Sequence, residues 1–345
     1  MVRVIKTICL SIILVLLTGM LACRKDKPTP CSNNSECFEF DWGNQSPAIT
    51  WFSNERFQYK SPYFNPNNGD EFVYNYYDFE LNKFSLMKYN LVTSEKATLA
   101  SDVKIISQPK WSREGWIAFD NVFNKNYQIW VIKDNGDSLK QFTNTKYNLY
   151  PAWGDGEYLY LQHTPILASN SFFLKQNINN PKHDTIMKHG DINEGVSILN
   201  DISNNMLISQ TLINNTPSIG YTNLNLISFN NLINLEQSNL IGLLGLCWSN
   251  NSSVAYFTVF NNSENDGLFR LNVITSEYTR LFPFCDSKRY TKISTSPDGT
   301  KLIGERVDSY LDKDTDNNPT GQVIENSSIY IIDLQTLKET KINLE

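Results

Sequence analysis

The chain has 345 residues, of which 19% are charged and 12% are aromatic, and its formal net charge is −6. An acidic chain without a cluster of basic residues argues against nucleic acid as a partner. The length allows one large domain or two small ones. The aromatic residues, together with many Asn and Ser, suit an all-β protein with many turns.

The first residues have the pattern of an export signal. Arg3 and Lys6 precede an apolar run over 8–17, and small and apolar residues follow as far as Cys23. The run is too short, and its flanks are wrong, for a permanent membrane span. We therefore predict that residues 1–22 are removed on export. Their removal leaves 28 Lys and Arg against 36 Asp and Glu, a formal charge of −8.

The stretch Met-Leu-Ala-Cys at 20–23 resembles the lipobox of bacterial lipoproteins, in which a small residue precedes the Cys that receives the lipid. The resemblance implies that Cys23 is lipidated, so that the lipid anchor alone holds the protein on the membrane. The alternative is an ordinary signal peptide cut near Ala22. Arg24 stands where an Asp would indicate inner-membrane retention, so we expect an outer-membrane lipoprotein of the cell envelope, facing the periplasm or the outside. Residues 23–47 are polar and predict a flexible tether.

Four further cysteines give an even number in an oxidising compartment. Cys31 and Cys37 are close enough in sequence to pair within the tether. Cys247 and Cys285 bracket one candidate repeat, and a disulfide between them would staple it. A metal site is the alternative, but no Cys-x-x-Cys and no nearby His supports it.

A strand–turn–strand pattern recurs along the chain, with an aromatic or small anchor residue before a polar turn and an alternating apolar run. The anchors are Phe64, Trp111, Trp153, Trp248 and Thr295. Their intervals are 47, 42, 95 and 47 residues, so a weaker copy must lie between 153 and 248, and we place its anchor at Leu199. Six copies of about 46 residues, each with four short strands, predict a six-bladed β-propeller over residues 48–345.

The motif is more specific than its period. The stretch PKWSREGWIAF at 109–119, followed by YQIWVIKDNGDSLKQFT at 127–143, resembles the WD40-like repeat of TolB-type propellers. The Ser-Pro-Asp-Gly turn at 296–299 reproduces that repeat most literally, whereas Arg113-Glu114 replaces its Pro-Asp and the fourth copy is degraded. The resemblance implies a TolB-like fold and protein–protein contacts through one propeller face or the central pore.

The conspicuous residues of the motif are expected to be structural. The turn glycines allow positive φ, and the tryptophans fill the space between adjacent blades. These residues are Gly115, Gly156, Gly299, Trp111, Trp153 and Trp248. Ring closure leaves two alternatives. Residues 48–53 pair with the last blade and close the ring, or they cap one face because 337–345 already supply an outer strand.

No motif in the chain indicates catalysis. There is no GxSxG, no HExxH and no phosphate-binding GxxxxGK[ST]. The three histidines, His163, His183 and His189, are expected in the third blade and its connection to the fourth, as solvated loop residues. They would form a metal site only if they converged in space.

The segment 310–326 is expected to be a long loop inserted between two strands of the sixth blade. Asp312, Asp314 and Asp316 alternate like the first ligands of a calcium loop, and Asn317 holds the turn position. The twelfth position is Val323 instead of Glu, so the segment is no EF-hand. A looser calcium site and a solvated acidic loop remain the alternatives.

The stretches 75–83, 120–126 and 257–267 are expected to line the same face as 310–326, where their Tyr, Phe and Asn suit recognition of protein or glycan. We therefore expect a lipid-anchored, non-enzymatic interaction module that binds an envelope protein. A cell-surface glycan- or nutrient-binding protein is the alternative, and a propeller hydrolase or lyase is less favoured.

Overall fold

The computed structural model describes residues 50–53, 55–123, 126–145, 147–154, 156–163, 172–188, 194–213, 216–224, 229–249, 252–261 and 263–345. The predicted export signal, Cys23 and the tether with Cys31 and Cys37 lie outside these residues. All elements within them are β-strands, and so this part of the chain has no helix able to cross a membrane.

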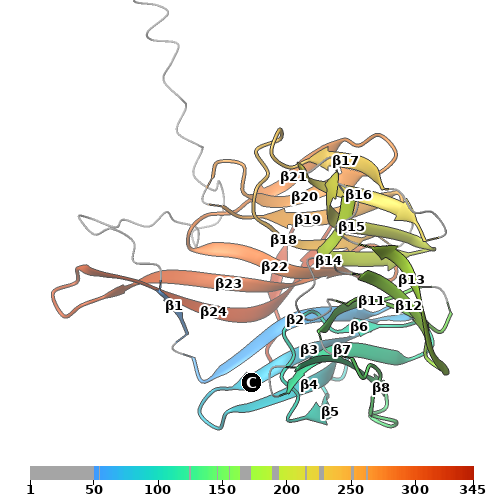
Figure 1. Ribbon diagram of the computed structural model, residues 1–345. Helices are drawn as coiled ribbons and strands as arrows, with labels where there is room; N and C mark the ends of the chain where they lie inside the picture. The colour runs from blue at the N-terminus through green and yellow to red at the C-terminus, as the bar shows by residue number, and fades with distance from the viewer. Residues whose placement is uncertain are drawn as a thin grey trace, which may run out of the picture. The chain divides into compact units, whose positions relative to one another are not determined.

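Six antiparallel sheets form the blades of a β-propeller, so the predicted all-β, six-bladed fold is confirmed (Figure 1). Each blade has four consecutive strands, and the first strands of the blades contact one another around the axis. Blade one contains β2 (Phe57–Asn65), β3 (Asn68–Asp78), β4 (Lys83–Asn90) and β5 (Lys96–Ser101). Blade two contains β6 (Lys110–Trp111), β7 (Trp116–Phe123), β8 (Asn126–Lys133) and β9 (Lys140–Gln141). Blade three contains β10 (Asn148–Trp153), β11 (Tyr158–His163), β12 (Phe172–Asn177) and β13 (Asn180–Lys188). Blade four contains β14 (Glu194–Ser203), β15 (Met206–Ile213), β16 (Thr216–Asn223) and β17 (Asn230–Asn234). Blade five contains β18 (Leu243–Trp248), β19 (Val254–Val259), β20 (Gly267–Asn272) and β21 (Tyr278–Pro283). Blade six contains β22 (Lys288–Thr295), β23 (Lys301–Lys313), β24 (Pro319–Asp333) and β25 (Glu339–Lys341).

The turn between the first and second strands of a blade, here called the A–B turn, follows its anchor residue. Gly115, Gly156 and Gly299 have φ values of 74°, 67° and 71° there, which confirms the predicted positive φ. Blade four uses a different turn. Asn204 and Asn205 both have positive φ, 49° and 59°, as the central residues of a tight type I′ hairpin do.

This tighter turn moves the anchor of blade four. Trp248 pairs with Ala255 in blade five, and the corresponding pair in blade four is Ile202 with Leu207. The predicted anchor Leu199 is therefore wrong by three residues. The A–B turn of this blade lacks the Gly that marks the position in blades two, three and six.

The indole rings pack between blades, as predicted. Trp111, Trp153 and Trp248 are 2%, 8% and 2% exposed. The Nε1–H of Trp153 donates to the carbonyl oxygen of Lys110 in blade two, and that of Trp248 to Met206 in blade four, both at 2.9 Å. Each of these two side chains thus joins its own blade to the preceding one.

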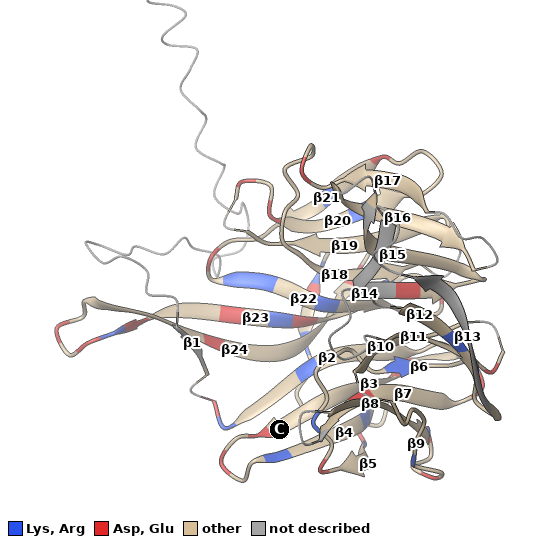
Figure 2. Cartoon of the chain, in the orientation of Figure 1, with Lys and Arg blue, Asp and Glu red and all other residues tan. Residues whose placement is uncertain are grey.

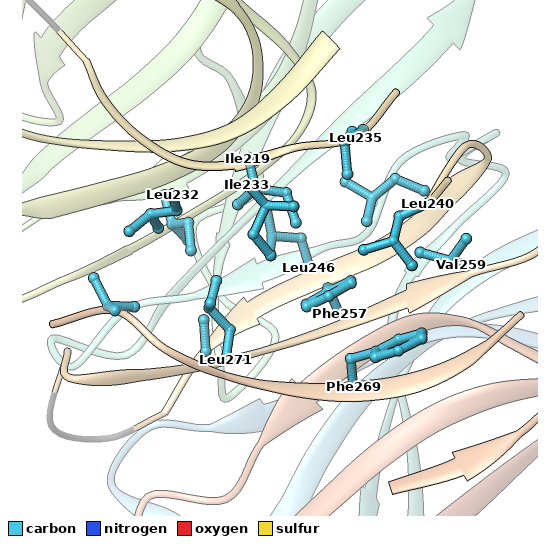
Figure 3. Packing of buried hydrophobic residues seen from close by; sticks show 14 of the residues in the cluster. Ile219, Leu232, Ile233, Leu235, Leu240, Leu246, Phe257, Val259, Phe269 and Leu271 are labelled. Carbon is cyan, nitrogen blue, oxygen red and sulfur yellow. The ribbon is translucent and has the colours of Figure 1, made fainter. Parts of the chain in front are cut away.

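Apolar side chains fill the space between blades four and five (Figure 3). Ile219 and Leu246 come from the two facing sheets, and Phe257 stacks on Phe269 with ring centroids 4.9 Å apart. Burial of this area stabilises the contact between the sheets, at about 25 cal/mol per Å².

Ring closure combines the two predicted alternatives. Strand β1 (Thr50–Phe52) pairs in parallel with β24 at Gln322–Ile324, so it does join the last blade. However, β25 is the outer strand of that blade, and blades one and six exchange no strand of their four. Between them, apolar residues such as Phe64, Tyr74 and Ile303 form a shared core.

The predicted loop 310–326 is instead mostly strand. Strands β23 and β24 pair from Lys301↔Asp333 as far as Lys313↔Pro319, with one register shift between Leu311 and Lys313 and a short turn at the tip. The hairpin extends well beyond the other blades, with β1 beside it (Figure 1). Charged and polar residues are frequent in this hairpin, which locally resembles a loop.

The other expected loops are partly strand. Residues 75–78 belong to β3, 120–123 to β7 and 257–259 to β19. They end in the turns between the second and third strands, at the end of the blades opposite the A–B turns. Residues 260–266 are the longest connection among these three.

Candidate functional site

The first candidate site is the mouth of the central channel. A cavity of about 410 Å³ opens among the A–B turns, and all six blades contribute to its wall. Its lining residues include Tyr63, Trp111, Trp153, Asp201, Trp248 and Thr295. Because the anchors stand where the inner strands meet the turns, the repeat motif itself builds this cavity.

The rim of the mouth is polar. Arg113 and Glu114 lie exposed in the A–B turn of blade two, and the neighbouring side chain of Asn67 donates to the Arg113 carbonyl oxygen at 2.7 Å. The indoles are almost fully buried behind this rim. The mouth therefore offers charges and hydrogen-bonding groups to a partner more than aromatic surface.

Three side chains meet across the channel below the mouth. Tyr63, Lys110 and Asp201 belong to blades one, two and four, and each stands one residue before its anchor. The Lys110 ammonium lies 3.3 Å from Asp201 Oδ1, and the Tyr63 hydroxyl donates to the same oxygen at 3.4 Å. We call these residues the channel triad. Blades one and four are opposite in a ring of six, so the triad crosses the axis.

Buried charges need such compensation, because water no longer solvates them. Both charged side chains are less than 9% exposed, and Asp201 Oδ2 accepts the N–H of Trp248 at 2.9 Å. The ammonium also lies 4.6 Å from the centroid of the Tyr63 ring. Burial, and then the negative charge of Asp201, raise the pKa of Tyr63, so its phenol stays protonated and donates.

A second cavity, of about 160 Å³, lies on the other side of the triad. Tyr63 and Asp201 line the mouth, whereas Lys110 lines this second cavity together with Ser107, Gln108 and Lys292. Burial lowers the pKa of Lys292, and the nearby Glu305 carboxylate opposes that shift. The triad thus divides the channel into two compartments.

The predicted calcium residues lie at the tip of the β23–β24 hairpin, where Figure 2 shows acidic segments in red. Asp314 Oδ1 accepts the N–H groups of Asp316 and Asn318, both at 2.9 Å, while Asp312 Oδ2 accepts the Thr320 hydroxyl at 2.8 Å. The carboxylates therefore stabilise the turn. No three His, Cys, Asp or Glu side chains form a metal-binding group within the described ranges. Calcium binding stays a prediction.

Asn317 has a φ of 65°, so the predicted positive φ at the turn position is confirmed.

Two of the three histidines lie within the described residues, and the third does not. His163 in β11 and His183 in β13 belong to blade three, as predicted, and His189 lies outside the described residues. The Nδ1 of His163 is 3.0 Å from Asn148 Oδ1, so this ring is a hydrogen-bonded strand residue and not a solvated loop residue.

The predicted Cys247–Cys285 disulfide is wrong. Cys247 is a free, buried thiol on the inner strand β18, whereas Cys285 follows the outer strand β21. Cys285 is disulfide-bonded, with a partner outside the described residues. Burial, and then the negative charge of Asp201, raise the pKa of the Cys247 thiol, which keeps it protonated and unreactive.

Sequence reasoning missed the channel triad and Lys292. Lys110 directly precedes the anchor Trp111, and Lys292 lies three residues before Thr295. A charged residue at such a position, within a strand expected to be innermost, is the signal that was available. Its partners could not be identified because they come from distant blades.

Comparison with known proteins supports the fold alone. No protein-family model and no curated protein matches the chain. Among solved structures, it resembles TolB from Acinetobacter baumannii (TM-score 0.49, 14% identity, 76% of this chain and 65% of that one). It also resembles the propeller domain of the trilobed protease from Pyrococcus furiosus, with a TM-score of 0.52 and 10% identity over 83% of this chain and 84% of that one. A chain of a nidogen/laminin complex matches with a TM-score of 0.52 and 12% identity over 74% of this chain and 88% of that one.

The two matches with a TM-score of 0.52 agree with the β-propeller fold that the six sheets of this chain form. The chain spans less than two thirds of the TolB chain. The proteins that share the fold include a protease domain, described as having an open velcro topology, and a chain of a protein–protein complex. Fold similarity therefore does not choose between catalysis and binding.

Proposed function

We propose that this protein is a non-enzymatic interaction module of the bacterial cell envelope, anchored through lipidated Cys23, and that it binds a protein partner at the mouth of its channel. The observation that carries the proposal is the mouth itself. All six blades contribute to one cavity of about 410 Å³, with an exposed polar rim and a floor closed by the channel triad.

The chemistry of the rim favours a protein segment as the ligand. Arg113 and Glu114 present opposite charges side by side, and the A–B turns around them offer backbone and hydroxyl groups. Polar rims of this kind surround the contact region in protein–protein interfaces. Because the indoles are buried, they are poorly placed to stack on sugar rings, which makes a glycan the weaker alternative.

Cross-linking on intact cells, followed by pull-down and mass spectrometry, tests the proposal. We expect one envelope protein to be recovered with the wild type and lost with the charge reversal Arg113→Glu/Glu114→Arg. Both residues are exposed, so the fold should be retained. The matched control, Asp312→Lys/Lys313→Asp at the hairpin tip, reverses a pair of charges far from the mouth and should keep the partner.

Loss of the partner in the hairpin variant alone would move the interface to the extended hairpin. Recovery of no protein with the wild type would overturn the proposal and turn the search toward glycans, with a screen of soluble glycans as its next step. The anchor is tested separately by metabolic labelling with a palmitate analogue, which should mark the wild type and not Cys23→Ser.

A further inference from the structure

The second cavity of the channel contains a cation without an acidic partner in its wall. Lys292 lies in β22 and faces a cavity of about 160 Å³. Among the described residues, its ammonium makes one hydrogen bond, to the carbonyl oxygen of Leu244 at 3.5 Å. No Asp or Glu belongs to the described lining, and the other charged lining residue is Lys110, which is already paired with Asp201.

A buried hydroxyl lines the same cavity. Ser107 is 6% exposed, and its Oγ has no hydrogen-bond partner among the described residues. Its backbone N–H donates to Asp120 Oδ1 at 3.0 Å, which fixes the residue in place. The hydroxyl lies near that carboxyl group and favours its charged form, but neither Ser107 Oγ nor Asp120 Oδ2 has a hydrogen bond of acceptable geometry. Buried polar groups are normally satisfied, so the hydroxyl is a donor for a ligand.

We propose that this second cavity binds the carboxylate group of a small organic acid, with Lys292 as its counter-ion and Ser107 as a hydrogen-bond donor. This inference goes beyond the proposed function, because the site lies across the triad from the mouth. A carboxylate supplies a negative charge beside the Lys292 ammonium, which has no acidic side chain in its cavity wall although the charges of Glu305 and Asp120 also act on it, and it supplies acceptor oxygens for the hydroxyl.

The size and the donor set limit the ligand further. A cavity of about 160 Å³ has room for an acid of a few carbon atoms. A phosphate group carries more charge and three acceptor oxygens, and so it needs more donors than one ammonium and one hydroxyl. The remaining wall, which includes Tyr150, Pro151 and Leu246, suits a short apolar or weakly polar tail.

Saturation-transfer NMR with acetate tests the site. Acetamide serves as the neutral isostere and sulfate as the competing anion. We expect acetate to bind the wild-type protein and to be displaced weakly by sulfate and not by acetamide. Lys292→Met should weaken acetate binding at least tenfold, and Ser107→Ala should weaken it several-fold.

The controls separate the site from the fold. Lys313→Met removes an exposed lysine of the hairpin and should leave acetate binding unchanged. Ser107→Ala removes only one oxygen, so it reports on the site even if Lys292→Met unfolds. Absence of acetate binding in the wild type, equal binding of acetate and acetamide, tighter binding of sulfate, or wild-type binding by both variants would each overturn the proposal.

Discussion

The two ends of the central channel are built from different kinds of residue. At the mouth, anchors such as Trp111 and Trp248 belong to the repeat motif, and their side chains pack between blades. At the other end, Ser107 and Lys292 belong to no motif, and they present polar groups to a cavity. The comparison teaches that the repeated positions hold the ring together, whereas the positions between them are available for binding chemistry.

The largest expected effect belongs to the motif side. Trp248→Ala removes a buried indole that joins blades four and five, so we expect the free energy of unfolding to fall by about 3–5 kcal/mol. Ile202→Ala, at the same register position in blade four, removes a smaller and only partly buried side chain and should cost about 1–2 kcal/mol. Urea unfolding followed by circular dichroism measures both. Equal losses would show that the aromatic anchors have no special role.

The channel triad joins the two ends, and it provides the next test. Asp201→Asn leaves the Lys110 ammonium buried without a counter-charge, so we expect a loss of about 3 kcal/mol in the same unfolding experiment. The double variant Lys110→Met/Asp201→Asn should recover most of that loss, since it buries no unpaired charge while the amide oxygen still accepts from Trp248. A double variant as unstable as the single one would show that the ion pair is not what stabilises this contact.

The motif end of the channel was predictable from the sequence, because packing between blades imposes a repeating pattern. Trp111, Trp153 and Trp248 stand 42 and 95 residues apart, and the second interval spans two repeats; the positive φ of the turns after Trp111 and Trp153 follows from the presence of Gly. Blade four does not have this pattern at its A–B turn. Its Asn204-Asn205 turn is shorter, so its anchor is Ile202 instead of Leu199.

The polar contents of the channel were not predictable, because they depend on contacts between blades far apart in sequence. Asp201 meets Lys110 from 91 residues away, and no local pattern relates the two. The β23–β24 hairpin was misjudged for the opposite reason. Its acidic residues resemble a loop locally, while strand pairing over a long ribbon decides its structure.

A smaller effect separates two anchors of the mouth. The Nε1–H of Trp248 donates to Met206, whereas that of Trp111 is buried without an acceptor among the described residues. Trp248→Phe should therefore cost about 1 kcal/mol more than Trp111→Phe, since it alone loses a hydrogen bond and leaves a carbonyl unpaired. Urea unfolding of the two matched variants measures the difference. A larger loss for Trp111→Phe would indicate that its indole N–H has a partner in solution.

The smallest effect lies at the opposite end, and it appears as a dependence on pH. Asp120 Oδ1 accepts the N–H groups of Ile106 and Ser107, but burial raises the pKa of this carboxyl above its ordinary value. A carboxyl whose pKa is raised by folding stabilises the protein below its unfolded pKa, near 3.9, and loses that contribution as the pH rises through its folded pKa. Asp120→Asn does not titrate, so its stability relative to wild type should increase between pH 4 and pH 7.

Unfolding in urea at stepped pH measures that difference. Asp333→Asn is the matched control with the opposite sign. Hydrogen bonds from the backbone N–H and the hydroxyl of Thr336 lower the pKa of Asp333. This variant should therefore lose stability relative to wild type as the pH rises from the folded pKa to just above the unfolded pKa near 3.9, and the difference should be flat at higher pH. A flat difference for Asp120→Asn would mean that the Asp120 carboxylate is as well solvated as in the unfolded chain. The far end of the channel would then be an ordinary wetted pore, and its contrast with the packed mouth would fail.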